Sequence, residues 1–172
     1  MNQQLIAQLE AEASRANTDY VANWAGTKAE RIADLVDIAL NADGQTAARA
    51  LWALEKVAAA HHNILLPHIP ALVAALPRFT FSGMRRIACK ILMLTDVPQK
   101  FDGPIVDFCF RMLETPDEPI GVKANSMSLI ASRLSDYPEL KPELKAIVDS
   151  IIETSDSKGF VVRAKHSKLL ND

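Results

Sequence analysis

The sequence has little of what marks several common classes of protein. Only 6 of its 172 residues are glycine, and aromatic residues make up 6% of the chain. It has just two cysteines, Cys89 and Cys109, each inside an apolar helical pattern and without a second cysteine or a histidine at metal-ligand spacing. We therefore expect two buried thiols in a reducing cytoplasm. The scarcity of glycine, beside abundant alanine and leucine, favours helix.

Long apolar runs and a strong net charge are also missing. No apolar run approaches the roughly 18 residues that a membrane span needs. The first residues, "MNQQLIAQLEAEASRA", have neither the cationic start nor the small-residue cleavage site of a secretory signal. The net charge of −2 argues against a globally basic nucleic-acid binder and leaves a local basic patch open. We expect a cytoplasmic protein that does not enter the membrane.

Motifs for chemistry are absent as well. The sequence has no Gly-x-Ser-x-Gly elbow and no glycine pattern of a phosphate-binding loop. The segment "HHNILLPH" contains His61, His62 and His68, which suggests a metal site. However, adjacent histidines at a helix end point in different directions, and Pro67 interrupts the segment before His68. We expect no catalytic residue, no cofactor and no bound metal.

What the sequence does contain is a repeat. One phrase occurs four times, as "LVDIAL" from Leu35, "LVAALP" from Leu72, "IVDFCF" from Ile105 and "IVDSII" from Ile147. Each copy is followed by a second phrase with a basic residue, as in "MRRIACKIL" and "VKANSMSLI". Two interleaved phrases with a period near 40 residues are typical of stacked helix pairs.

Each phrase has the apolar spacing of a helix, and no stretch shows the period-two alternation of a strand. The sequence therefore predicts an all-α protein with one domain of four helix pairs, at about 27–60, 62–95, 101–136 and 139–171. An additional helix at 3–16 is expected to cap the first pair. Asp43, Asp117 and Asp156 each precede a second helix, where a carboxylate can accept from free backbone N–H groups.

This pattern resembles the HEAT repeat family, across about 145 residues. The resemblance rests on an aspartate in the turn followed six residues later by a basic residue, as in "DGQTAAR" (Asp43, Arg49) and "DEPIGVK" (Asp117, Lys123). The spacing from Asp156 to Arg163 is one residue longer, and Phe79 stands in place of the aspartate before Arg85. The chain also looks like small free-standing bacterial proteins of this type, which have no settled activity.

The resemblance implies a right-handed superhelix of helix pairs, with the second helices on its concave face. It also implies that the turn aspartates and the helix basic residues form a structural ladder of charge pairs. The residues of this expected ladder are Asp43, Arg49, Arg85, Asp117, Lys123, Asp156 and Arg163.

Charge is divided between the first and second helices of the predicted pairs. The first helices hold seven basic and thirteen acidic residues, counted over 27–42, 62–78, 100–118 and 137–156. The second helices hold eleven basic residues and one acidic residue, counted over 44–60, 81–95, 119–135 and 158–170. The single acid is Glu55. Arg86 and Lys90 share a helix face, and no nearby carboxylate in the sequence is expected to pair with them. The predicted concave face is therefore basic.

We expect a non-enzymatic interaction module that binds an acidic protein partner through this face. The alternative is a small HEAT-like DNA-binding or DNA-repair-type protein that contacts phosphates through the same face. A third interpretation is that these side chains are ordinary solvated surface. The candidate partner-binding residues are Trp52, Arg86, Lys90, Arg133, Lys165 and Lys168.

Overall fold

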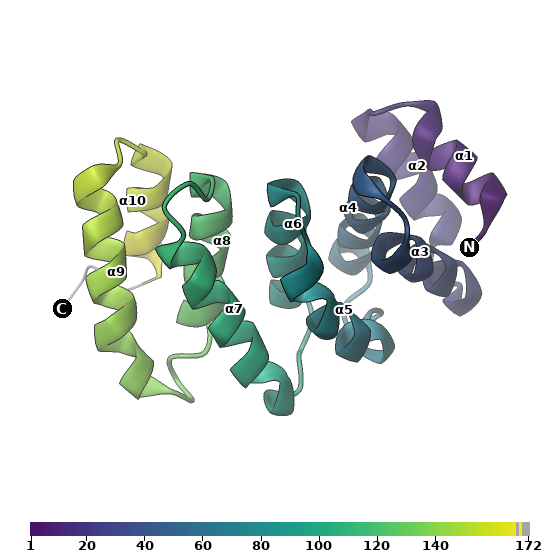
Figure 1. Cartoon of the computed structure of the whole chain (residues 1–172). Helices are drawn as coiled ribbons and strands as arrows, with labels where there is room; N and C mark the ends of the chain where they lie inside the picture. Colours follow the sequence, from purple (N-terminus) through teal and green to yellow (C-terminus); the bar gives the residue numbers. More distant parts are fainter. Residues whose placement is uncertain (168, 170–172) are drawn as a thin grey trace. The chain divides into compact units, whose positions relative to one another are not determined.

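The computed structural model describes residues 1–167 and 169, and this part of the chain is helical with no strand. The all-α prediction is therefore confirmed. The α-helices are α1 (Gln3–Ala11), α2 (Arg15–Ala25), α3 (Ala29–Asn41), α4 (Gly44–Ala60), α5 (Ile69–Ala75), α6 (Ser82–Met93), α7 (Asp102–Glu114), α8 (Ile120–Ala131), α9 (Lys141–Thr154) and α10 (Lys158–His166). Short 3-10 helices occupy Leu66–His68, Leu76–Arg78, Gln99–Phe101 and Pro138–Leu140. Figure 1 shows the helices in chain order.

The helix expected at 3–16 is two helices. The first, α1, ends at Ala11, and the second, α2, begins at Arg15. Ser14 caps α2, because its side chain accepts a hydrogen bond from the backbone N–H of Asn17 at 3.1 Å. Gly26 ends α2 with φ of +51°, a backbone conformation that glycine adopts without steric cost. Residues 3–25 therefore form a helical hairpin rather than a single capping helix, and α2 was not predicted.

The predicted aspartate caps are not formed. Asp43 occupies the N-cap position of α4, but its side chain makes no capping hydrogen bond. The residue that caps α10 is Ser157, not Asp156, and it accepts from the backbone N–H of Phe160 at 3.3 Å. Pro119 holds the N-cap position of α8, where Asp117 lies too early to act.

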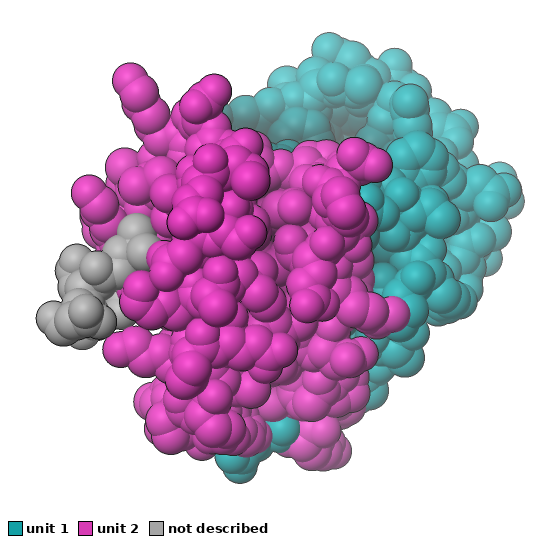
Figure 2. All heavy atoms as spheres, turned by 60° about the vertical axis from the view of Figure 1, so that its left-hand side comes forward, with its two compact units in different colours: residues 1–99 teal, residues 100–172 magenta. Residues whose placement is uncertain are grey.

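Contacts divide the chain into two compact units, unit 1 (1–99) and unit 2 (100–172), which Figure 2 colours teal and magenta. In unit 1, α4 packs against α3, and also against α2 and α6. In unit 2, α8 packs against α7, α9 and α10. Each unit thus has even-numbered helices lying side by side, with odd-numbered helices packed against them.

The apolar repeat phrases form the cores of the units. In unit 1, Leu35 and Ile38 of α3 and Leu51 and Leu54 of α4 are fully buried, and Ile105 of α7 is fully buried in unit 2. A second set in unit 2 is buried on α8 and α9: Met127, Ile130, Leu144 and Val148. Cys89 and Cys109 are both buried, as predicted. The burial of so much Leu, Ile and Val supplies the main driving force for folding.

Candidate interaction surface

Charge is divided between the odd-numbered and even-numbered helices of each unit. In unit 1 the even-numbered helices carry six basic and two acidic residues, and the odd-numbered helices carry one and four. In unit 2 the even-numbered helices carry four basic residues and no acidic one, and the odd-numbered helices carry three basic and six acidic residues. The segregation read from the sequence therefore holds with the observed helix bounds, and it holds in each unit separately.

In unit 1 the candidate residues Trp52, Arg86 and Lys90 lie on two adjacent helices, and Lys56 is a further basic residue on the first of them. Trp52 and Lys56 are one turn apart on α4, and both are half-buried. Arg86 and Lys90 are one turn apart on α6, and both are exposed. The two helices pack side by side, and Trp52 and Lys56 lie on the part of α4 that also lines hollows with α2. We call these four residues of α4 and α6 together the even-helix surface of unit 1.

Lys90 has a partner that the sequence analysis did not foresee. Its ammonium lies 2.6 Å from a carboxylate oxygen of Glu55 on α4, and this carboxylate is 6% exposed while Lys90 is 51% exposed. The expectation that no carboxylate lies near this pair of basic residues was therefore wrong. Arg86 also takes part in an interaction within the chain. Lys90 serves first to neutralise a buried charge.

Arg133 does not lie on an open surface. Its Nε is 2.7 Å from Asp102 Oδ1, and the two side chains are 10% and 9% exposed. Its Nη1 donates to the carbonyl oxygen of Leu129 at 3.0 Å and to the hydroxyl of Ser132 at 3.1 Å. Arg133 thus ties the end of α8 to the start of α7, and we withdraw it from the candidate binding residues.

The remaining candidates of unit 2 lie at the C-terminal end of the chain. Lys165 is exposed in the last turn of α10, beside His166. Lys158 is exposed in the first turn of the same helix. Lys168 lies outside the described residues. On the even-numbered helices of unit 2, the exposed basic side chains among the described residues are therefore those of α10, since Lys123 on α8 is buried.

The basic residues of the expected ladder bond mostly to backbone carbonyls. Arg49 Nη1 donates to the carbonyl oxygen of Leu9 at 2.9 Å, which joins α4 to the last turn of α1. Arg85 Nη1 donates to the carbonyl oxygens of Phe79 and Thr80 at 3.0 and 2.7 Å. Phe79, which stands where an aspartate was expected, thus accepts a hydrogen bond from Arg85 through its backbone carbonyl oxygen.

The two ladder residues of unit 2 follow the same logic. Lys123 is buried, and its ammonium lies 3.4 Å from the carbonyl oxygen of Pro116. Arg163 donates to the amide oxygen of Asn125, which links α10 to α8. The expected acceptors Asp43, Asp117 and Asp156 are all exposed. These basic residues stabilise helix packing, although their acceptors are not the predicted ones.

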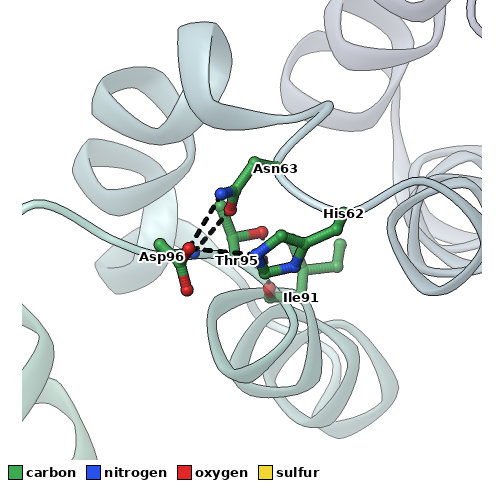
Figure 3. Close-up of polar contacts among 5 residues, drawn as sticks. All are labelled: His62, Asn63, Ile91, Thr95 and Asp96. Atoms are coloured by element: carbon green, nitrogen blue, oxygen red, sulfur yellow. Dashed lines mark hydrogen bonds and ion pairs between the residues drawn. The ribbon is translucent and has the colours of Figure 1, made fainter.

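A polar cluster joins the loop after α4 to the end of α6 (Figure 3). The side-chain amide of Asn63 donates to Asp96 at 2.8 Å, and the backbone N–H of Asp96 donates back to Asn63 Oδ1 at 2.8 Å. The ring of His62 lies 3.0 Å from the same carboxylate. The hydrogen bond from Asn63, together with His62, lowers the pKa of Asp96 below its ordinary value.

This cluster accounts for one histidine of "HHNILLPH". Burial lowers the pKa of a second, His68. Among the described residues, no three His, Cys, Asp or Glu side chains converge to hold a metal ion. None of the described helices combines the length and the apolar character needed to cross a membrane.

A hollow of about 380 Å³ between α2 and α4 was missed by the sequence analysis. Its lining residues are Asp19, Ala22, Asn23, Gly26, Lys56, Val57, Ala60 and His61. Half of these residues come from α2 and its C-terminal glycine, so the hollow could not be predicted from the sequence without predicting that helix. Ser14 and Gly26, residues that commonly begin and end helices, were the available signals.

Comparison with known proteins gave one finding. The family described as HEAT repeat domain matches residues 5–169. Neither a curated protein nor a solved structure gave a significant match. HEAT repeats are generally scaffolds for protein interactions. The match extends over nearly the whole chain, from α1 past the end of α10, so this protein belongs to the HEAT repeat domain family.

Proposed function

We propose that the protein is a non-enzymatic interaction module that binds an acidic protein segment through its basic even-numbered helices. The observation that carries the proposal is the charge segregation, which recurs in both units. Complementary charge guides a partner to one side of a protein and disfavours binding on the other. In unit 1 the even-helix surface adds Trp52, a residue type enriched among energetically dominant contacts.

The structure narrows the set of residues that can meet a partner. Lys90 is committed to Glu55 and Arg133 to Asp102. We assign the binding role to Trp52 and Lys56 in unit 1, and to Lys158 and Lys165 in unit 2. Arg86 has an interaction within the chain, but its side chain is exposed and adds positive charge to the same pair of helices. The acidic odd-numbered helices would repel the same partner.

The test compares capture of partners from a cell lysate by three forms of the full chain. These are the wild type, a Lys56→Glu/Arg86→Glu variant and a control, Lys28→Glu, which reverses an exposed charge next to α3. We expect the wild type and Lys28→Glu to retain the same protein after nuclease treatment, and the double variant to lose it. Helical circular dichroism of each form shows whether the substitutions disturb folding.

Nucleic acid is the alternative partner, and the same experiment distinguishes it. Material that disappears with nuclease would support binding to a phosphate backbone. The logarithm of the affinity would then fall by about 0.9 per phosphate contact for each tenfold rise in salt. Capture of the same material by all three forms would show that the even-helix surface of unit 1 is not the binding site.

A further inference from the structure

The hollow between α2 and α4 exists because small residues face one another across it. Ala22 and Gly26 lie on one side, and Ala60 lies on the other, beside Val57. Two packed helices normally fill this space with larger side chains. Here the φ of +51° at Gly26 also disfavours any residue with a side chain. The small residues Ala22, Gly26 and Ala60 therefore leave the hollow unfilled.

The rim of the hollow is polar on both sides. Asp19 and Asn23 come from α2, and Lys56 and His61 come from α4 and its C-terminal end. Asp19 is already engaged, since its carboxylate lies 3.5 Å from the guanidinium Nε of Arg15. The α4 side of the rim therefore presents cationic or hydrogen-bonding groups that can face a ligand.

Lys56 differs from the other basic residues on the even-numbered helices of unit 1. Arg15 pairs with Asp19, Arg49 bonds to Leu9, and Lys90 pairs with Glu55. Arg85 and Arg86 also have partners within the chain. Among contacts between described residues, the ammonium of Lys56 has none, although its side chain is half-buried. No buried side-chain nitrogen among the described residues lacks a partner, so the ammonium of Lys56 stays within reach of a ligand while its stem is partly covered.

Trp52 extends the same stripe of α4 by one turn. It lines a smaller hollow with Leu9, Asn17 and Thr18, so it too faces α2 rather than α6. Positions 52, 56 and 60 recur at helical spacing along one face, and His61 follows Ala60 directly as the C-cap of α4. An aromatic ring followed by an ammonium and an imidazole suits a side chain with an apolar stem and an anionic end.

Resting on the proposed function, we infer that this hollow is a subsite for one carboxylate side chain, glutamate or aspartate, of the acidic partner segment. Lys56 supplies the charge, and the amide of Asn23 and the ring of His61 supply hydrogen-bond donors. Asp19 lies on the opposite rim, and it would penalise a doubly charged phosphate more than a singly charged carboxylate. The hollow thus favours an acidic peptide over a phosphorylated one.

The experiment is an amide-shift NMR titration of the full chain with the α-methylamide of N-acetylglutamate, whose only carboxylate is that of the side chain, and separately with inorganic phosphate. We expect this glutamate amide to shift the backbone signals of Asn23, Gly26, Ala60 and His61 in a saturable manner, and phosphate to bind less tightly. Lys56→Gln should weaken binding of the glutamate amide about tenfold, the scale of one charge-assisted hydrogen bond. Asp19→Asn should strengthen it, because a carboxylate leaves the rim.

The control is Lys141→Gln on α9 of unit 2, which removes an exposed charge that does not line the hollow and should leave the titration unchanged. Absence of saturable shifts at these four residues would overturn the inference, as would an equal loss in both lysine variants. Tighter binding of phosphate would overturn the choice of carboxylate. The titration does not depend on partner capture, so a saturable shift with no captured protein would refute the proposed function alone.

Discussion

At the scale of single residues, two ion pairs decide which charges of the chain are structural. In unit 2, Arg133 and Asp102 are both buried and lie 2.7 Å apart. In unit 1, a largely buried Glu55 is paired with a half-exposed Lys90 at 2.6 Å. Removing one member of such a pair leaves a buried charge, which costs more than the pair itself contributes.

The Asp102→Ala substitution should lower the free energy of unfolding by about 3 to 5 kcal/mol, because it leaves the guanidinium of Arg133 buried without a counter-charge. Urea denaturation at neutral pH measures the loss. The Asp102→Leu/Arg133→Leu double variant should lose less than Asp102→Ala, since it leaves no buried charge. A loss below about 1 kcal/mol in Asp102→Ala would contradict a buried, charged pair.

A similar argument applies to Lys90→Met, which leaves the carboxylate of Glu55 without its cation. We expect a loss of about 1 to 3 kcal/mol in the free energy of unfolding. The control is Lys56→Met, because Lys56 is next to Glu55 on α4 but is in no ion pair between described residues. It should change the free energy of unfolding by less than about 0.5 kcal/mol. Chemical denaturation of the two variants side by side is the measurement. Equal effects would mean that Lys90 is not specifically paired.

At the scale of elements, the cluster of His62, Asn63 and Asp96 fixes the loop after α4 against the end of α6. Asn63 has φ of +62°, which a non-glycine residue adopts at a cost. Its two hydrogen bonds to Asp96 provide a reason for this conformation. The cluster therefore holds neighbouring helix pairs of unit 1 in register.

The cluster predicts a particular dependence of stability on pH. Because the folded state lowers the pKa of Asp96 below its ordinary value of 3.8, its contribution is present above that pH. The contribution is lost as the pH falls through the lower, folded value. Wild type should therefore be more stable than Asp96→Asn at neutral pH, and the difference should shrink below about pH 4. Urea midpoints across this range test the prediction, and a constant difference would contradict it.

A second prediction concerns the backbone of Asn63. Asn63→Ala loses the hydrogen bonds and places a side chain at positive φ, so we expect a loss of about 1 to 3 kcal/mol. Asn63→Gly also loses the hydrogen bonds but accepts this φ without strain. Thermal or chemical unfolding of the pair separates the two contributions. If Gly were no better tolerated than Ala, the positive φ would carry no cost.

Sequence reasoning could recover the helix pairs, because buried Leu, Ile and Val recur with a period that helices impose. It failed at α2, where Arg15–Ala25 contains more polar than strongly apolar residues and Ser14 alone marks the start. It also missed both ion pairs. Glu55 and Lys90 are 35 residues apart, and only packing of α4 against α6 brings them together. Local spacing in a sequence does not carry that information.

At the scale of the whole molecule, the chain consists of two compact units, each with its own core. Stability in repeat proteins is approximately a sum of local terms, because each repeat contacts its neighbours only. A substitution should therefore act mainly within its own unit. The buried pairs described above provide one probe for each unit.

Native-state hydrogen exchange should show this division. Asp102→Ala should lower amide protection in α7–α10 and leave α3 and α4 nearly unchanged, whereas Lys90→Met should do the reverse. Exchange followed by peptide-level mass spectrometry resolves the two regions. Equal loss of protection in both regions from either substitution would show that the chain unfolds as one cooperative body.

The small net charge of −2 conceals how strongly each unit is polarised. Helix residues alone give a net of +4 on the even-numbered side and −3 on the odd-numbered side of each unit. Each unit is thus an electric dipole, and a dipole experiences a torque in the field of a charged body. A strongly acidic partner would turn each unit before touching it, so that encounters begin with the even-numbered helices forward. The same polarity would let the protein bind both cation and anion exchangers near neutral pH.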